Sequence, residues 1–202
     1  LKHKILLGLL SMVFSGICHA QSNWPNGQTV RVIVPFPGGA STLDSVVRTL
    51  TPEMGKNLSS PVIVDNKPGA GTVIGVDATA KATDGYTVGG VANSFTVNQT
   101  LVKNLPYNAS KDLQPVILIA KTANVLAVRP GLPVNNLKEL IAYAKKNPGK
   151  LSYGSFGNGT TAHFAGEMLK SQAGIFVVHI PYRGQGPALT DLLAGNIDLM
   201  FG

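Results

Sequence analysis

Two glycine-rich turns hold the residues of this chain whose types and spacing suit chemistry, and that chemistry is anion binding. Each turn stands directly before a predicted helix and combines glycines with hydroxyls: Gly38, Gly39 and Ser41 in the first, and Gly157, Gly159, Thr160 and Thr161 in the second. A helix start offers unpaired N–H groups and a partial positive charge, and glycine lets a ligand approach that backbone closely. Such groups suffice to hold a carboxylate. Because most α/β turns contain glycine and bind nothing, one turn alone is weak evidence.

Motifs of nucleotide binding and catalysis do not fit the chain. No Gly-x-x-x-x-Gly-Lys-Ser/Thr sequence occurs, and Gly157-Asn158-Gly159 lacks the third glycine of the dinucleotide fingerprint. A hydrolase elbow needs glycine two residues before its serine, whereas Tyr153 occupies that position before Ser155. We therefore interpret Ser155 as a loop hydroxyl. The sequence predicts a binding protein with no enzymatic activity and no cofactor, and a hydrolase is the weaker alternative.

Two further side chains are candidate ligand-binding residues. His163 and Glu167 lie four residues apart on a predicted helix, a spacing that two metal ligands could share. His179 lies on a separate predicted strand, so we interpret both histidines as structural and expect no metal site, while keeping His163 as a candidate for ligand contact. Arg183 follows another strand and could clamp a carboxylate with two hydrogen bonds, although a surface arginine is the alternative.

Short apolar runs alternate with helical patterns and must position these turns. Strand-like runs bounded by breakers cover residues 29–35, 62–64, 116–120, 125–128 and 175–180, and further strands start at Tyr86 and Leu151. Helical patterns cover residues 73–82 and 137–146. One further helix begins after Ser41, and another follows Thr160 and ends at Ala173. Four glycine-rich turns each follow a strand and precede a helix, so we predict an α/β fold with largely parallel sheets. Ligands of such sheets bind beyond the carboxyl ends of the strands.

The helix after the first turn has a marked start and a marked face. Ser41 and Asp44 have the spacing of a capping box, in which each side chain bonds to the backbone of the other. The apolar residues of this helix recur on one face: Leu43, Val46, Val47 and Leu50. We expect this face to pack on the sheet, which would fix the position of the first turn.

The composition is that of a globular chain. With 202 residues and 44% hydrophobic residues it can bury a sizeable core, and 23 glycines against 13% charged residues favour short elements and tight turns over a coiled coil. The formal net charge is +7, but the basic residues are scattered and Lys145-Lys146 is their only adjacent pair. We therefore expect no nucleic-acid partner.

The first twenty residues have the pattern of a cleavable export signal. Lys2 and Lys4 precede an apolar run over residues 5–17, and we expect cleavage after Ala20. Cys18, the only cysteine, would leave with the signal, so no disulfide is expected. The run is too short to span a bilayer comfortably, so we predict a periplasmic protein that is not embedded in the membrane.

Several motifs resemble the tripartite tricarboxylate transporter receptors, which are also called Bug proteins. The similarity lies in residues 24–25, 30–36, 64–71, 84–87, 105–107, 147–151, 153–155, 181–184 and 198–201, which follow the order and spacing of the family's signatures. The resemblance implies a two-lobed flytrap fold that holds an organic acid or amino acid between its lobes and passes it to membrane permease subunits. A protein that presents its ligand to a sensor kinase would share these features and is the alternative.

The resemblance also implies which residues contact the ligand. In the family, the turns that match residues 36–41 and 155–161 grip a carboxylate. The candidate set, with the two side chains named above, is Phe36, Pro37, Gly38, Gly39, Ala40, Ser41, Ser155, Gly157, Asn158, Gly159, Thr160, Thr161, His163 and Arg183.

Family members are longer than this chain, which bears on how it is divided. We expect residues 21–120 to form a first lobe that lacks its returning C-terminal segment, and residues 121–202 to form an incomplete second lobe. The chain stops in an apolar strand at Leu199-Met200-Phe201, which we expect to leave a sheet edge uncovered. We therefore predict a fragment or a truncated product with its C-terminal part missing, and a monomer in the complete protein.

Overall fold

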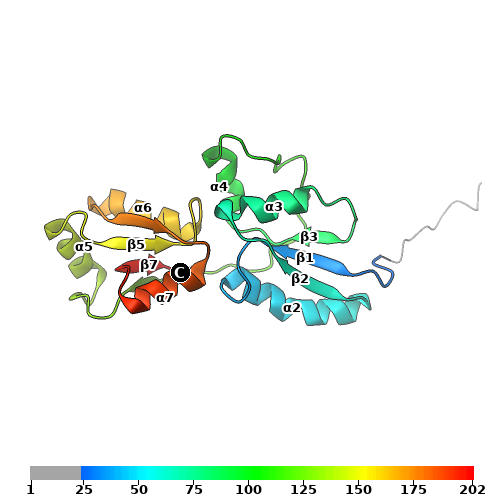
Figure 1. The fold of residues 1–202 in the computed structure, drawn as a ribbon, viewed down its shortest axis with the longest axis horizontal. Coiled ribbons are helices and arrows are strands. Elements are labelled where there is room, and N and C mark those ends of the chain that lie inside the picture. Colours follow the sequence, from blue (N-terminus) through cyan, green and yellow to red (C-terminus); the bar gives the residue numbers. More distant parts are fainter. Residues whose placement is uncertain (1–23) are drawn as a thin grey trace, which may run out of the picture.

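The computed structural model describes residues 24–202, so the predicted export signal over residues 1–20 lies outside the described part of the chain. Two α/β lobes stand side by side, each with its own sheet (Figure 1). The two-lobed architecture with helices against mostly parallel sheets confirms the predicted fold class.

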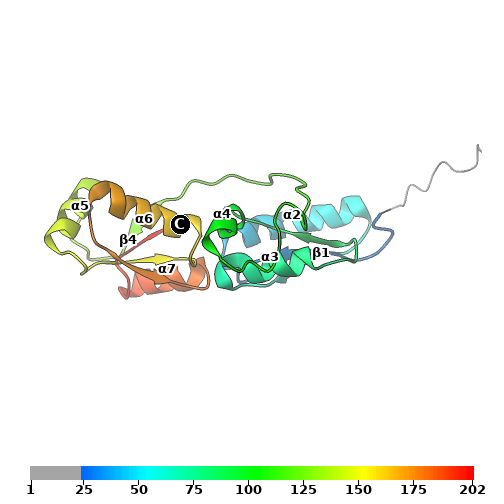
Figure 2. The same ribbon diagram turned by 90° about the horizontal axis from the view of Figure 1, so that it is seen from above.

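The first lobe is a three-stranded parallel sheet in the order β2-β1-β3. Its strands are β1 (Val30–Val34), β2 (Val62–Asn66) and β3 (Thr87–Gly89), and its helices are α2 (Thr42–Leu58), the 3-10 turn η2 (Ala70–Thr72), α3 (Val73–Ala80) and α4 (Ser94–Leu101). Helices α2 and α3 lie on opposite sides of the strands (Figures 1 and 2). The central strand β1 is therefore buried on both faces, which explains its continuous apolar sequence.

The second lobe is a four-stranded sheet in the order β4-β7-β5-β6. Its strands are β4 (Leu126–Val128), β5 (Ser152–Ser155), β6 (Val178–Pro181) and β7 (Leu199–Phe201), and its helices are α5 (Leu137–Lys146), α6 (Thr161–Ala173) and α7 (Gln185–Ala194). Strand β7 pairs with β4 antiparallel and with β5 parallel. The expectation that the final strand leaves an uncovered edge is wrong, because β7 has a hydrogen-bonded neighbour on each side.

Each lobe has its own apolar core beneath its helices. In the first lobe, Val32, Val34, Phe36 and Val47 form one buried cluster. In the second lobe, a larger cluster joins the sheet to α5 and contains Leu140, Leu151, Tyr153 and Leu199. Phe36 and Tyr153 thus anchor the two segments that lead into the candidate turns.

The predicted strand over residues 116–120 is wrong. This segment is part of an extended connection that runs from the first lobe to the second (Figure 2), and Val116 and Ile117 expose 84% and 78% of their surface. Its β-branched residues favour an extended backbone, but a strand also needs a hydrogen-bonding neighbour. Helix α4 was not predicted, because its mixed polar sequence over residues 94–101 has no helical pattern of apolar residues.

The start of α2 confirms one half of the predicted capping box and corrects the other. The Ser41 side chain accepts a hydrogen bond from the Asp44 N–H at 3.1 Å, as predicted. The Asp44 carboxylate, however, accepts from the N–H of Gly39 at 2.7 Å and not from that of Ser41. The predicted apolar face is buried at Val47 but ends at Leu50, which is exposed.

A glycine inside α6 gives a first testable prediction. A Cβ added to Gly166 would overlap the ring of the buried Tyr153. Replacing glycine by alanine inside a helix ordinarily stabilises it by about 0.5–1 kcal/mol, but overpacking costs about 1–3 kcal/mol. We therefore expect Gly166→Ala to lower the midpoint of urea unfolding, whereas Ser171→Ala on the exposed side of the same helix should leave the midpoint unchanged or raise it. A Gly166→Ala variant as stable as the parent would contradict this packing.

Candidate functional site

The turn after β1 is held by its own side chains. Asn66 donates one hydrogen bond from its amide to the carbonyl oxygen of Phe36 at 2.9 Å and another to Asp44 Oδ1 at 2.7 Å. Gly39 gives its N–H to the same carboxylate. The helix start that the sequence offered to a ligand is therefore already paired with an internal carboxylate, Asp44.

Asp44 is a buried carboxylate with several donors around it. Its exposed surface is 0%, and Arg48 donates from Nε to Asp44 Oδ2 at 2.8 Å. Burial alone would raise the pKa of Asp44, but the hydrogen bonds from Arg48, Asn66 and Gly39 outweigh it and lower the pKa below its usual range. The group is thus ionised at neutral pH, and it ties β2 and α2 to the first turn.

The turn after β5 is also bonded within itself. The Ser155 hydroxyl is fully buried and accepts the N–H of Gly157 at 3.2 Å. The Thr160 hydroxyl donates to the carbonyl oxygen of Gly157 at 2.7 Å. No side chain caps α6, whose N-cap residue is Thr160, so the first N–H groups of this helix have no capping partner. Of the two helix starts that follow the candidate turns, that of α2 is capped by a side chain and that of α6 is not.

The two histidines that the sequence placed on separate elements stack on each other. The ring centroids of His163 on α6 and His179 on β6 are 4.6 Å apart, and His179 stacks on Tyr153 at 4.7 Å. Burial, followed by the nearby His163, lowers the pKa of His179. The interpretation of both as structural histidines agrees with these contacts, although their proximity could not be read from their spacing.

Ser155 and His179 also form a pair that motif matching did not find. The Ser155 Oγ and His179 Nε2 atoms are 2.7 Å apart. Within residues 24–202, no carboxylate forms a hydrogen bond to His179, so the third member of a hydrolytic triad is absent there. The arrangement fits a loop hydroxyl that is fixed by an imidazole.

The lobes meet at four turns, and glycines on three of them allow the close approach. An added Cβ on Gly71 would lie 2.5 Å from the carbonyl oxygen of Asn158, and one on Gly184 would lie 2.9 Å from Cδ of Pro37. The turn with Gly71 was not among the candidate residues. Its backbone is unusual, because Ala70, Gly71 and Thr72 have successive positive φ angles of 47°, 60° and 82°. The Gly-Ala-Gly sequence after β2 was the available signal.

Two cavities adjoin this contact between the lobes. The smaller one, about 70 Å³, is lined by Phe36, residues 69–72, Phe156, Tyr182 and Arg183. The larger one, about 620 Å³, is lined by Ala70, Gly71, Asn98, Leu101, Val102, Gly157, Asn158, His163 and Pro181. The structure thus places five candidate residues at a cavity, and the other nine line neither: Pro37, Gly38, Gly39, Ala40, Ser41, Ser155, Gly159, Thr160 and Thr161.

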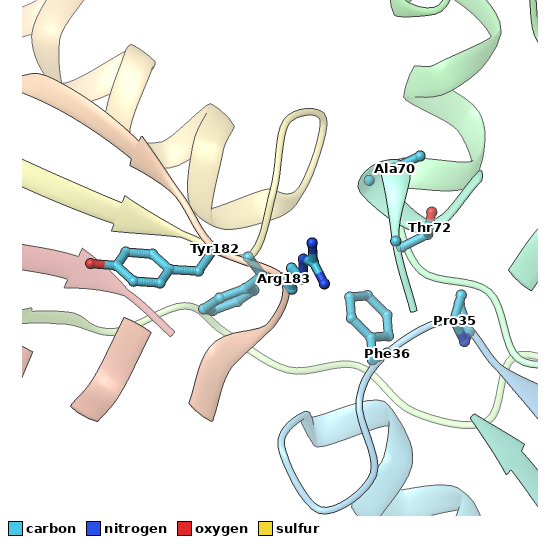
Figure 3. A pocket seen from close by; sticks show the side chains of 9 residues that line it. Pro35, Phe36, Ala70, Thr72, Tyr182 and Arg183 are labelled. Carbon is cyan, nitrogen blue, oxygen red and sulfur yellow. The ribbon is translucent and has the colours of Figure 1, made fainter. Parts of the chain in front are cut away.

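Arg183 lies at the mouth of the smaller cavity. Figure 3 shows its guanidinium in the gap between the lobes and facing Phe36, while the hydroxyl of Tyr182 points away into the second lobe. That hydroxyl donates to Asp191 at 2.7 Å, and burial together with this bond raises the pKa of Tyr182 to about 12. Among the described residues, Arg183 forms no ion pair. Its charge is therefore available to an anion.

Between residues 24 and 202, no cluster of three or more histidine, cysteine, aspartate or glutamate side chains has an arrangement that could hold a metal ion. None of the helices over this range combines the length and the apolar sequence that crossing a membrane requires.

Comparison with known sequences gives one consistent match. The profile of the tripartite tricarboxylate transporter family receptor matches residues 46–202. A UPF0065 protein of Bordetella pertussis is 46% identical over 175 residues, which is 85% of this chain and 53% of that protein.

Solved structures match over both lobes. The periplasmic binding protein BugD has a TM-score of 0.81 at 36% identity, over 86% of this chain and 58% of its own. A Rhodopseudomonas palustris protein determined with adipate has a TM-score of 0.84 at 32% identity, over 88% of this chain and 60% of its own. MatC from the same organism, with bound malate, has a TM-score of 0.79 at 31% identity. The match covers 86% of this chain and 60% of MatC. The chain thus spans between half and two thirds of the length of these proteins.

Proposed function

Because the chain belongs to the tripartite tricarboxylate transporter family of receptors, we propose that it is a periplasmic receptor for a small carboxylate. It takes an organic acid or amino acid between its lobes and delivers it to the permease subunits of such a transporter. Export through residues 1–20 with cleavage after Ala20, a division at residues 120 and 121, and a monomeric state are parts of this proposal.

One observation supports the proposal above all: the turns of both lobes converge on cavities beside Arg183, which has no ion-pair partner within residues 24–202. These turns follow the carboxyl ends of parallel strands, where α/β sheets bind their ligands. The uncapped start of α6 follows the turn with Gly157 and Asn158, which line the larger cavity, and its partial positive charge favours an anion there. An anion between the lobes would thus be held by backbone donors and by Arg183.

The ligands of the similar structures indicate the class of compound. Adipate and malate are both dicarboxylates, and each is bound by a protein that matches this chain over both lobes. Backbone amides recognise a carboxylate generically, while the rest of the ligand is read by the shape of the pocket. We therefore propose small carboxylates as the class and use adipate as the probe.

Ligand binding is tested by thermal unfolding with adipate and with 1,6-hexanediol, which has the same carbon chain but no charge. A ligand that binds only the folded protein raises the unfolding temperature with its concentration. The proposal predicts a shift with adipate, malate or another carboxylate of a screened series and none with the diol. A screen in which no carboxylate shifts the transition would overturn it.

Arg183→Gln is expected to weaken adipate binding by about tenfold to a hundredfold, because a hydrogen bond to a charged group contributes about 1.5–3 kcal/mol. Isothermal titration calorimetry measures this change. The matched control is Lys145→Gln, which removes the same charge from the exposed surface of α5, away from the cavities. Equal losses in both variants would indicate general electrostatic attraction and not a contact by Arg183.

Hydrolysis is the second candidate function, since Ser155 and His179 are within hydrogen-bonding distance. Ser155 lines neither cavity and its hydroxyl is occupied by the turn, so we propose capture without turnover. NMR spectra of an ester or amide of the bound carboxylate, followed over hours with the protein, should remain unchanged. Product formation that is lost in Ser155→Ala would overturn this view.

A further inference from the structure

The three stacked rings of the second lobe lie beneath the turn that is proposed to bind the carboxylate. Tyr153 on β5, His179 on β6 and His163 on α6 follow one another at centroid distances of 4.7 and 4.6 Å. Both imidazoles are partly buried. The stack therefore joins three elements directly behind the turn of residues 155–160.

Each histidine holds one end of this turn. His163 Nδ1 accepts the N–H of Gly159 at 3.2 Å. His179 Nε2 lies 2.7 Å from the Ser155 hydroxyl, which in turn accepts the N–H of Gly157. The Thr160 hydroxyl bonds the middle of the turn at the Gly157 carbonyl oxygen, and the two imidazoles hold the turn at Ser155 and at Gly159.

The contact at His163 requires an unprotonated Nδ1. A neutral imidazole has one acceptor nitrogen, whereas both nitrogens of an imidazolium are donors. Protonation of His163 at Nδ1 would therefore place two donors against each other and release Gly159. A second charge on His179, 4.6 Å away, would add repulsion between two like charges.

The charged groups that face His163 and His179 offset the repulsion between two protonated imidazoles only in part. Within residues 24–202, Glu167 on α6 is the carboxylate that acts on His179, and it already accepts hydrogen bonds from Tyr153 at 2.7 Å and from Lys170 at 2.8 Å. Lys170 adds a positive charge on the same helix. Strand β7, which also packs against α6, contributes only Leu199, Met200 and Phe201. Within residues 24–202, neither imidazole forms a hydrogen bond to a carboxylate.

We propose that His163 and His179 are positioning residues that hold the turn of residues 155–160 in its binding conformation only while the pair is neutral. This rests on the proposed function, since that turn is part of the proposed carboxylate site. Carboxylate capture should then weaken in mildly acidic medium.

The direction of the pH effect follows from the pKa of His179. Burial and then His163 lower this pKa below its ordinary value of 6.5, so the folded protein binds fewer protons than the unfolded chain just below pH 6.5. The contribution of His179 is complete above that pH and declines below it. The transition lies in the range where only histidine among unperturbed side chains titrates.

NMR spectra between about pH 8 and about pH 5 test the positioning role without any ligand. The amide signals of Gly157 and Gly159 should move with the same midpoints as the imidazole signals of His179 and His163. His163→Asn places a non-titrating oxygen near the position of Nδ1. The variant should therefore keep the hydrogen bond to Gly159 and lose the pH dependence of the Gly159 amide signal. Amide signals of Gly157 and Gly159 that do not change with pH at the imidazole midpoints would overturn the proposal.

Adipate binding measured at both ends of that pH range tests the consequence. The loss of one hydrogen bond, about 1 kcal/mol, predicts an affinity about fivefold lower at the acidic end in the parent. The titration of adipate itself affects the parent and His163→Asn equally. The contribution of the histidine is therefore the difference between the two proteins in the ratio of the affinity near pH 8 to the affinity near pH 5. The same ratio in both proteins would contradict the proposal. If adipate binds neither protein at any pH, the choice of ligand fails while the amide titration still decides the positioning role.

Discussion

Gly71→Ala is expected to weaken adipate binding by about tenfold to a hundredfold, because overpacking of a close contact costs about 1–3 kcal/mol. The added Cβ would lie 2.5 Å from the backbone carbonyl oxygen of Asn158, and a backbone atom cannot turn aside as the end of a side chain can. Gly71 lines both cavities, and its own carbonyl accepts a hydrogen bond from Asn98 of α4 at 2.9 Å, which fixes the turn to the first lobe. The lobes could then approach each other less closely around the ligand.

The matched control separates the contact between the lobes from backbone strain. Gly71 and Gly85 both have a positive φ, 60° and 72°, so alanine at either position bears a similar conformational cost. At Gly85, however, an added Cβ meets nothing within 4 Å. Calorimetry should therefore show a large loss of affinity in Gly71→Ala and little in Gly85→Ala, while urea unfolding registers the strain in both. Unchanged affinity in Gly71→Ala would show that binding does not require this contact.

Features that depend on neighbouring residues in the sequence could be predicted. The Ser41 cap and the end of α6 at Gly174, a left-handed residue, both follow from chemistry within one turn of helix. The glycine turns after β1 and β5 were found for the same reason. The order of strands, turns and helices was then sufficient to predict two α/β layers with mostly parallel sheets.

The segment of residues 116–120 shows where local patterns fail. Its sequence Val-Ile-Leu-Ile-Ala has the composition of a buried strand, yet it forms no ladder and Val116 and Ile117 are exposed. Strand formation is decided by the partner across the sheet, and a partner is a property of the whole fold. The interior position of β7 could not be predicted for the same reason.

The candidate site was predicted in outline but not in its contacts. Sequence reasoning found the turns around Gly39 and Gly157, but it gave the Gly39 N–H to a ligand, whereas Asp44 accepts it. It also separated His163 from His179, whose rings stack although they are sixteen residues apart on different elements. Pairings between distant segments arise from the packing of elements, so no spacing rule reveals them.

Asp44→Ala is expected to lower the free energy of unfolding by about 3–4 kcal/mol, because three donors lose their acceptor at a cost of about 1 kcal/mol or more each. These donors are the N–H of Gly39, the amide of Asn66 and the guanidinium of Arg48. Arg48 is half exposed and can form hydrogen bonds with water instead, whereas Asn66 is partly buried. Urea unfolding measures the loss. The control is Glu53→Ala on the same helix, whose exposed pair with Lys56 should contribute less than about 1 kcal/mol.

The pH dependence of Asp44→Asn separates the charge of this side chain from its shape. The pKa of Asp44 is lowered in the folded protein, so its carboxylate stabilises the fold fully above the ordinary value of 3.8 and progressively less as the pH falls below it. An asparagine oxygen in the place of Oδ2 keeps the acceptor for Gly39 and Arg48, but the NH₂ group then stands against the amide donor of Asn66. The stability difference between parent and variant should therefore be large at neutral pH and shrink in acid. A difference that stays constant through this range would show that Asp44 acts through its shape alone, and the first turn would then not depend on a buried charge.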